Sequence, residues 1–227
     1  MENKSQLEDA VEFADNPEPR CPCVLLLDTS GSMAGERIDA LNRGLITFRD
    51  DIIMDSLATR RVEIAIVSFN SEVRLVQDFS TMDKFQPPTL VTGGQTHMGT
   101  AIERALDLTE SRKKTFHDHG ITYYRPWVFM ITDGKPEGES PEAVQRAASR
   151  LKASEKSKGV AFFAVGVEGA DMRHLAQIAV RTPIKLHGLK FGPMFQWLSA
   201  SMQNVSHSNP DDVMVALPAV GWSSVSQ

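Results

Sequence analysis

Short apolar runs, spaced evenly along the chain and separated by helical patterns, constrain the fold more than any other feature of the sequence. The runs cover residues 23–27, 61–69, 127–132 and 159–167. Strands that are apolar on both faces have to be covered by other elements on both faces, and their alternation with helices is typical of a parallel sheet. Residues 73–79 follow the turn-prone pair Asn70-Ser71, so they predict an antiparallel strand at one edge. We therefore predict an α/β fold with a mostly parallel sheet between two layers of helices.

Amphipathic helices are predicted between and after these strands. One helix carries apolar side chains at steps of three and four, which places them on one face: Ile38, Leu41, Leu45, Phe48 and Ile52. Another begins at Ser140-Pro141, where a hydroxyl cap precedes a proline in the first turn, and it closes at Gly159. The last helix, with the same spacing, runs from Phe191 to Val205.

The length and composition fit one folded domain without a basic surface. The chain has 227 residues, of which 41% are hydrophobic and 23% charged, and its net charge is −5. These values are typical of globular proteins, and the acidic balance argues against nonspecific binding to nucleic acids. We predict an acidic, flexible segment over residues 1–19, a domain over residues 20–207, and a tail over residues 208–227 that could pack on the domain.

The cysteines and the apolar segments predict the cellular compartment. Cys21 and Cys23 flank Pro22 on one predicted strand, a poor geometry for a disulfide between them. The first residues are acidic and lack the basic start and apolar stretch of a secretory signal. No stretch approaches the roughly 18 apolar residues of a membrane span. We therefore expect a cytoplasmic protein that does not bind membranes.

Oxygen-bearing side chains follow two of the predicted strands. Asp28, Ser30 and Ser32 stand at alternate positions directly after the first strand, and Asp133 follows the strand over residues 127–132. Ligands of open α/β sheets bind beyond the carboxyl ends of the strands. If these two strands are neighbours, the two carboxylates face each other across that crevice.

A third polar loop precedes a predicted helix and contributes Thr96. Its paired glycines, Gly93 and Gly94, allow the backbone to approach other groups closely. The three loops together offer two carboxylates and three hydroxyls, a set that suits a hard divalent cation and leaves it with an incomplete coordination shell. An open position invites an anionic ligand, most simply a carboxylate from a partner protein. So few ligands favour Mg²⁺ over Ca²⁺, and Mn²⁺ remains an alternative.

These motifs resemble the metal-ion-dependent adhesion site of von Willebrand factor type A (VWA) domains. The resemblance rests on DTSGS at residues 28–32, on Thr96 within GGQTHMGTAI and on Asp133 within ITDGKPEG, and it extends from Cys21 to about residue 206. It implies a doubly wound, Rossmann-like fold of six strands in the order 3-2-1-4-5-6. It also implies Mg²⁺ bound directly by Ser30, Ser32 and Thr96, and directly or through water by Asp28 and Asp133. A Glu or Asp of a partner would complete the shell.

Two longer segments resemble a narrower group. DTSGSMAGERIDALNRGL and YYRPWVFMITDG look like bacterial cytosolic VWA proteins, including those associated with tellurium-resistance and stress operons. This resemblance implies an adaptor whose partner is a kinase, a phosphatase or an ATPase encoded nearby. The chain has no Walker-type phosphate loop, so nucleotide hydrolysis would belong to another chain.

Alternative interpretations remain for the same residues. Each of the five site residues, taken singly, is typical of helix caps and turns. Asp28 could also be the nucleophile of a metal-dependent phosphohydrolase. Such enzymes usually carry a second Asp two residues later, where this chain has Ser30, so we expect a binding module and no enzyme.

Zinc is a less favoured alternative to the oxygen site. Its ligands would come from the histidines and the two cysteines, whose spacing lacks the paired pattern of zinc sites: His97, His117, His119, Cys21 and Cys23. Residues 113–125 are predicted to form a long loop of the kind that often carries interactions.

Overall fold

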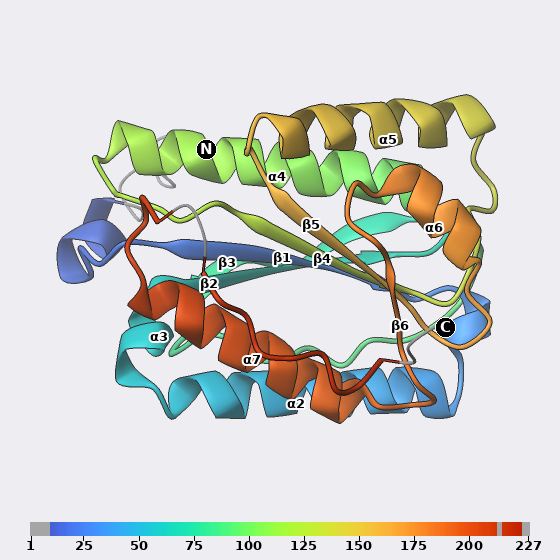
Figure 1. The fold of residues 1–227 in the computed structure, drawn as a ribbon, viewed down its shortest axis with the longest axis horizontal. Coiled ribbons are helices and arrows are strands. Elements are labelled where there is room, and N and C mark those ends of the chain that lie inside the picture. The colour runs from blue at the N-terminus through green and yellow to red at the C-terminus, as the bar shows by residue number, and fades with distance from the viewer. Residues whose placement is uncertain (1–9, 213–214, 224–227) are drawn as a thin grey trace.

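The strand β1 (Cys21–Asp28) lies inside a six-stranded sheet in the computed structural model, which describes residues 10–212 and 215–223 (Figure 1). The other strands are β2 (Val62–Phe69), β3 (Val73–Thr81), β4 (Trp127–Thr132), β5 (Ala161–Gly166) and β6 (Ile184–Lys185). Their order is β3-β2-β1-β4-β5-β6, and β3 is antiparallel to β2 while the other neighbours are parallel. The predicted sheet, its strand order and its antiparallel edge strand are confirmed.

Helices cover both faces of the sheet, as predicted (Figure 1). On one face lie α2 (Glu36–Ile53), α3 (Ser56–Arg61) and α7 (Phe191–His207). On the other lie α4 (Met98–Asp118), α5 (Pro141–Lys156) and α6 (Met172–Ile178), and a short 3₁₀ turn, η1 (Gly31–Met33), follows β1. The Ser140 hydroxyl accepts a hydrogen bond from Ala143 N, which caps α5 as the sequence indicated.

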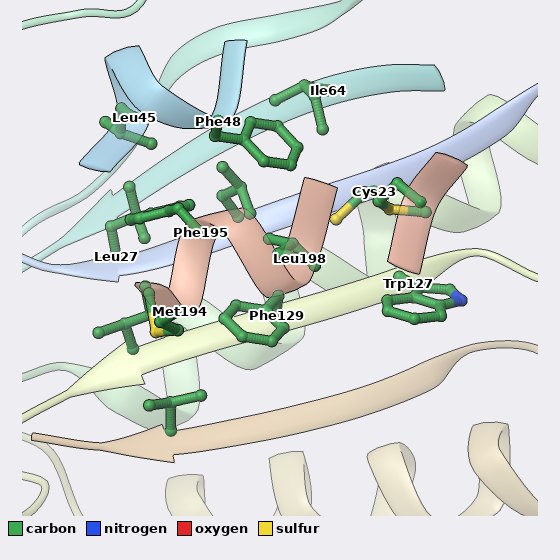
Figure 2. Packing of buried hydrophobic residues seen from close by; sticks show 14 of the residues in the cluster. Cys23, Leu27, Leu45, Phe48, Ile64, Trp127, Phe129, Met194, Phe195 and Leu198 are labelled. Carbon is green, nitrogen blue, oxygen red and sulfur yellow. The ribbon is translucent and has the colours of Figure 1, made fainter. Parts of the chain in front are cut away.

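The core consists of two apolar layers, one on each side of the sheet. Alternate residues of β1 point to opposite faces, so Leu27 packs toward α2 and α7 while Leu26 packs toward α4 and α5. Figure 2 shows the first layer, in which Phe48 of α2 and Phe195 of α7 meet with their ring centroids 6.0 Å apart. The two helices approach closely at Gly44, where an added Cβ would lie 2.3 Å from Cδ2 of Phe195.

One predicted loop is helical instead. Residues 113–118 continue α4, which ends at Asp118 and is followed by Gly120 in the left-handed region (φ 67°). The ion pair between Lys114 and Asp118, four residues apart, supports this last turn. The interpretation of residues 113–125 as one long loop was therefore wrong over its first six residues.

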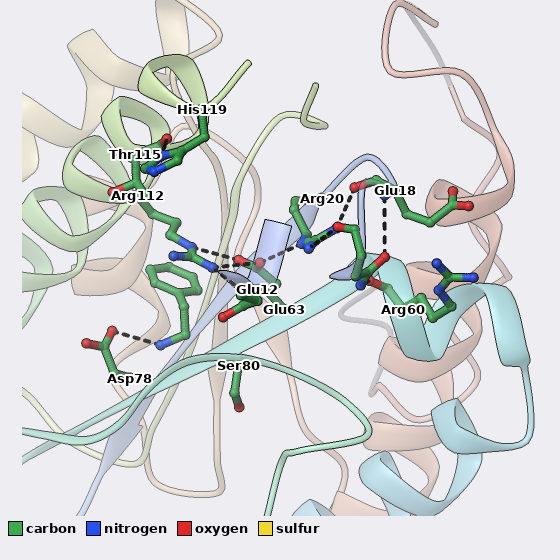
Figure 3. A network of polar contacts seen from close by, with 12 residues as sticks. Glu12, Glu18, Arg20, Arg60, Glu63, Asp78, Ser80, Arg112, Thr115 and His119 are labelled. Carbon is green, nitrogen blue, oxygen red and sulfur yellow. Dashed lines mark hydrogen bonds and ion pairs between the residues drawn. The ribbon is translucent and has the colours of Figure 1, made fainter. Parts of the chain in front are cut away.

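Residues 10–15 are helical, and a buried charge network holds this segment at the start of the sheet. In Figure 3, Glu63 lies between two guanidinium groups: Arg20 Nε is 2.9 Å and Arg112 Nη2 is 2.8 Å from Glu63 Oε1. Both guanidinium groups also lie over the ring of Phe13, at 5.3 and 5.2 Å from its centroid. The expected flexibility of residues 1–9 lies outside the described residues, whereas the described part of this segment is packed.

The tail is described over residues 208–212 and 215–223, and its second stretch runs along α7 (Figure 1). Trp222 is buried, its ring centroid 5.8 Å from that of Trp197. Trp197 Nε1 donates a hydrogen bond of 2.8 Å to Pro218 O, and Ser223 forms an isolated β-bridge with Leu186. The tail thus adds apolar cover beside β6.

Candidate metal site

Three loops meet at the carboxyl edge of the sheet and carry all five predicted site residues. They follow β1, precede α4 and follow β4, which pairs directly with β1. The backbone ties the first two loops together, because Gly31 N donates to Gly94 O at 3.1 Å and Gly93 N donates to Thr29 O at 2.9 Å. The pairing of β1 with β4 brings Asp28 and Asp133 to the same edge, as the sequence predicted.

Asp28 is buried at the end of β1, and both of its carboxylate oxygens accept hydrogen bonds. Ser30 N donates to Oδ1 at 2.8 Å, and the Thr132 hydroxyl donates to Oδ2 at 2.5 Å. Burial raises the pKa of Asp28, and the nearby charge of Asp133 raises it further. The hydrogen bonds from Ser30 and Thr132 oppose this rise. The result is a fixed, desolvated carboxylate that a cation would stabilise.

Ser30 and Ser32 link Asp28 to Asp133, through the backbone N of Ser30 and the hydroxyls of both serines. The hydroxyl oxygens of Ser30 and Ser32 lie 3.0 Å apart, and the Ser32 hydroxyl donates to Asp133 Oδ1 at 2.7 Å. The second oxygen of Asp133 forms an ion pair with the Arg37 guanidinium, which also donates to Ser32 O at 3.0 Å. Arg37 therefore supplies a positive charge at the place where the sequence predicts a metal.

Thr96 completes the cluster from the loop before α4. A Cβ built on Gly134 would lie 3.6 Å from the Thr96 hydroxyl oxygen and 3.9 Å from Asp28 Oδ2, so both oxygens border the position of Gly134. Thr96 and Glu137 exchange two backbone hydrogen bonds, of 3.3 and 2.9 Å, which fix this loop against the one after β4. The five predicted residues lie in one group of oxygen donors.

Gly94 allows its loop to take this position. Its φ is 76°, and an added Cβ would lie 2.5 Å from the Ser71 hydroxyl oxygen. That hydroxyl accepts a hydrogen bond of 2.9 Å from Gln95 N. The close backbone approach that the paired glycines predicted is therefore present at the second of them.

Two residues at the site were missed by sequence reasoning. Thr132 lies inside the ITDG motif, but the sequence predicts it only as the last residue of a buried strand. Arg37 lies in the first turn of α2, where the helix dipole disfavours basic residues. That unfavourable position was the sequence feature that could have indicated a role for Arg37 at the site. Both residues contact one of the two site carboxylates.

The donor set fits a hard cation and offers little to zinc. Within residues 10–212 and 215–223, no group of three or more His, Cys, Asp and Glu side chains could hold a metal. The two predicted carboxylates and three hydroxyls are oxygen donors of the kind that Mg²⁺ binds together with water. Cys21 and Cys23 are buried free thiols, and burial raises the pKa of both. His117 is instead 89% exposed, so the structure does not bring these residues into one site.

The family model for the von Willebrand factor type A domain matches residues 23–186. No sequence relative is found among curated proteins. In the described parts of the chain, no helix has the length and apolar character that crossing a membrane requires.

Several solved structures share the fold at low sequence identity. A von Willebrand factor type A protein from Catenulispora acidiphila superposes with a TM-score of 0.65 at 19% identity, covering 82% of this chain and 43% of that one. The pilus adhesin SpaC from Lactobacillus rhamnosus GG superposes with a TM-score of 0.61 at 15% identity, covering 82% of this chain and 30% of that one. The vWF domain of the pilus tip protein Mfa5 from Porphyromonas gingivalis superposes with a TM-score of 0.58 at 12% identity, covering 83% of this chain and 94% of that one. The chain thus spans less than half of the first two proteins.

Proposed function

Since this chain belongs to the von Willebrand factor type A domain family, we propose that it is a protein-interaction module that holds Mg²⁺ and binds an acidic side chain of a partner through it. Domains of this family are often adhesion or protein-interaction modules. In the proposal, the hydroxyls of Ser30, Ser32 and Thr96 bind the metal directly. Asp28 and Asp133 bind it directly or through water.

The observation that carries this proposal is the convergence of five oxygen-bearing side chains from three separate loops on one point. Their hydrogen bonds hold the oxygens in place before any ligand arrives, as the Asp28 and Ser32 contacts illustrate. Mg²⁺ held there would supply an open coordination position for a carboxylate of the partner. Asp28 would provide buried negative charge, and Arg37 would release Asp133 from its ion pair.

The environment of Asp28 supports binding more than catalysis. Its two oxygens already accept hydrogen bonds, and the position two residues later, where an acid–base Asp would stand in an aspartyl-phosphate enzyme, is Ser30. We therefore propose a non-enzymatic role, with a phosphohydrolase that uses Asp28 as nucleophile as the alternative. A phosphatase assay on p-nitrophenyl phosphate with Mg²⁺ separates the two, because activity lost in Asp28→Ala would favour the enzyme.

The narrower resemblance extends the proposal to a setting. We propose a bacterial cytoplasmic adaptor in a stress or tellurium-resistance system, with a kinase, a phosphatase or an ATPase as partner. The two buried free thiols, Cys21 and Cys23, agree with a reducing compartment.

Two measurements test the metal-dependent interaction. Isothermal titration with MgCl₂ should show binding to the wild type and to Asp83→Ala, an exposed control, but not to Asp28→Ala or Thr96→Ala. A pull-down from native cytosol, with Mg²⁺ or with EDTA, should retain a partner only on wild type and only with metal. If capture survives in Asp28→Ala and in EDTA, the metal site does not determine binding.

A further inference from the structure

A groove runs along α5, beginning beside the candidate metal site. Its first part, of about 520 Å³, lies between α5 and α6; Lys135 stands at its start, two residues after Asp133, and Val144 and Ala148 of α5 line it. Its second part, of about 660 Å³, is lined by Arg125, Glu155 and Arg181, among others. Lys152 of α5 lines both hollows, so they are neighbours along this helix and together are here called the α5 groove.

The α5 groove is basic, although the protein as a whole is acidic. Its lining holds five cationic side chains against two carboxylates, and the chain carries a net charge of −5. The cations are Lys135, Lys152, Lys156, Arg125 and Arg181. A local excess of one sign in a hollow attracts ligands of the other sign.

The two carboxylates of the groove are turned toward the protein. Glu139 accepts hydrogen bonds from Gly99 N at 2.5 Å and Thr100 N at 3.1 Å, in the first turn of α4. Glu155 Oε1 accepts from Arg181 Nε at 3.0 Å and from Phe162 N at 3.3 Å. Glu155 Oε2 has no hydrogen-bond partner among the described residues, but it is buried and is not presented to the groove, so the two carboxylates offset the cations only in part.

Hydrogen-bonding capacity remains along the same path. Nε2 of His174, which lines the first part, is buried and has no hydrogen-bond partner within the described ranges. Lys152 Nζ uses one of its three donors on Gln177 O, at 2.5 Å. Lys135 pairs with Asp171 at 3.3 Å, but its side chain is 69% exposed and this surface pair contributes little.

We propose that the α5 groove binds an extended, acidic segment of the partner protein whose leading carboxylate is the one bound at the metal site. This inference rests on the proposed function and adds the chemistry of the residues next to that carboxylate. The helix α5 has 16 residues, about 24 Å at 1.5 Å each, which an extended peptide of about seven residues spans. Several acidic side chains in that stretch would meet Lys152, Lys156 and Arg181 in turn.

The test is a binding titration with two labelled peptides, decaglutamate and triglutamate, followed by fluorescence anisotropy in MgCl₂. Decaglutamate reaches along the groove, whereas triglutamate reaches little beyond the metal site. Wild type should bind decaglutamate at least tenfold more tightly than triglutamate, and this difference should shrink as salt rises. A ten-residue oligothymidylate of similar charge, which lacks carboxylates, should bind more weakly than decaglutamate.

Charge reversal separates the groove from the metal site. Lys152→Glu/Lys156→Glu should weaken decaglutamate binding at least tenfold and leave triglutamate and Mg²⁺ binding unchanged, and Lys152→Gln/Lys156→Gln should give a smaller loss. Lys84→Glu, an exposed reversal after β3, serves as the matched control and should bind like wild type. Far-ultraviolet circular dichroism and the melting temperature verify that each variant is folded.

Each contrary result overturns a defined part of the argument. If the reversed variant binds decaglutamate like wild type while Asp28→Ala does not, the groove is not a binding site and the proposed function stands. If wild type binds neither peptide although it binds Mg²⁺, the acidic segment is the wrong ligand and the groove proposal fails. Equal binding of oligothymidylate and decaglutamate would identify a general polyanion surface and overturn the peptide assignment.

Discussion

Asp28→Asn is expected to stabilise the metal-free protein and to remove its stabilisation by Mg²⁺. In the wild type, Asp28 is buried beside Asp133, its pKa is raised chiefly by that burial, and no described residue forms an ion pair with it. The amide keeps the shape of the side chain. Its oxygen can still accept from Ser30 N, and its NH₂ group can donate to the Thr132 hydroxyl, which rotates to accept.

The magnitude follows from the burial and the two hydrogen bonds of this side chain. A buried ion costs several kcal/mol even after relaxation. Hydrogen bonds to a charged group contribute about 1.5–3 kcal/mol and those between neutral groups about 0.5–1.5 kcal/mol. Asp28→Asn therefore loses about 1 kcal/mol at each of the two hydrogen bonds. The net gain in the free energy of unfolding is about 1–3 kcal/mol, which corresponds to a rise in melting temperature of about 2–12 °C for a chain of this size.

Differential scanning calorimetry in EDTA and in Mg²⁺ measures both effects. At a Mg²⁺ concentration about a thousand times the Kd, the wild type should gain about 4.1 kcal/mol, and Asp28→Asn should gain nothing. The order of stability of the two proteins should therefore reverse between the two buffers. Asp83→Asn, an exposed carboxylate, should change little in either buffer.

The pH dependence provides a second readout. Because the pKa of Asp28 is raised by burial in the folded protein, the ionised form opposes folding above that pKa, and the cost disappears below the unfolded pKa of about 3.9. The advantage of Asp28→Asn in EDTA should shrink as the pH falls toward about 4. If the variant melts below the wild type in EDTA, or gains as much from Mg²⁺, the reasoning about this carboxylate is refuted.

Three further changes probe other parts of the molecule. Arg37→Ala removes a positive charge paired with Asp133 and should tighten Mg²⁺ binding about tenfold in calorimetric titration. Unchanged or weaker binding would contradict competition between the Arg37 guanidinium and Mg²⁺ for Asp133. Gly44→Ala places a Cβ against Phe195, and this overpacking outweighs the gain in helix propensity. Urea unfolding should therefore show a net loss of about 1–2 kcal/mol in the free energy of unfolding. A gain would show that α2 and α7 separate freely. Glu63→Gln removes the carboxylate that the Arg20 and Arg112 guanidinium groups share and should cost about 3–5 kcal/mol in the same assay, and a loss below about 1 kcal/mol would show that water reaches the network.

Much of the site was predictable because its residues stand at strand ends. The apolar strand before Asp28 and the one before Asp133 were both recognisable from a few consecutive residues, and oxygen-bearing side chains after such strands indicate a ligand site. Thr96 was predictable from the polar loop with paired glycines before α4, and the family motif pointed to it again. Arg37 was not predicted, because its role depends on how the first turn of α2 is oriented toward the loop after β4.

The sequence by itself determined the local structure of this protein: strands buried on both faces, amphipathic helices and three oxygen-rich loops. Continuous apolar runs mark the strands, a period of about 3.6 residues marks the helices, and the loops follow directly at the strand ends, so short segments reveal all three. It did not reveal β6, which has only two residues, or the continuation of α4 to Asp118. Only the tertiary structure set Arg37 on Asp133 and placed basic side chains around a groove between α5 and α6. Those arrangements depend on contacts between residues far apart in the chain, which no local periodicity encodes.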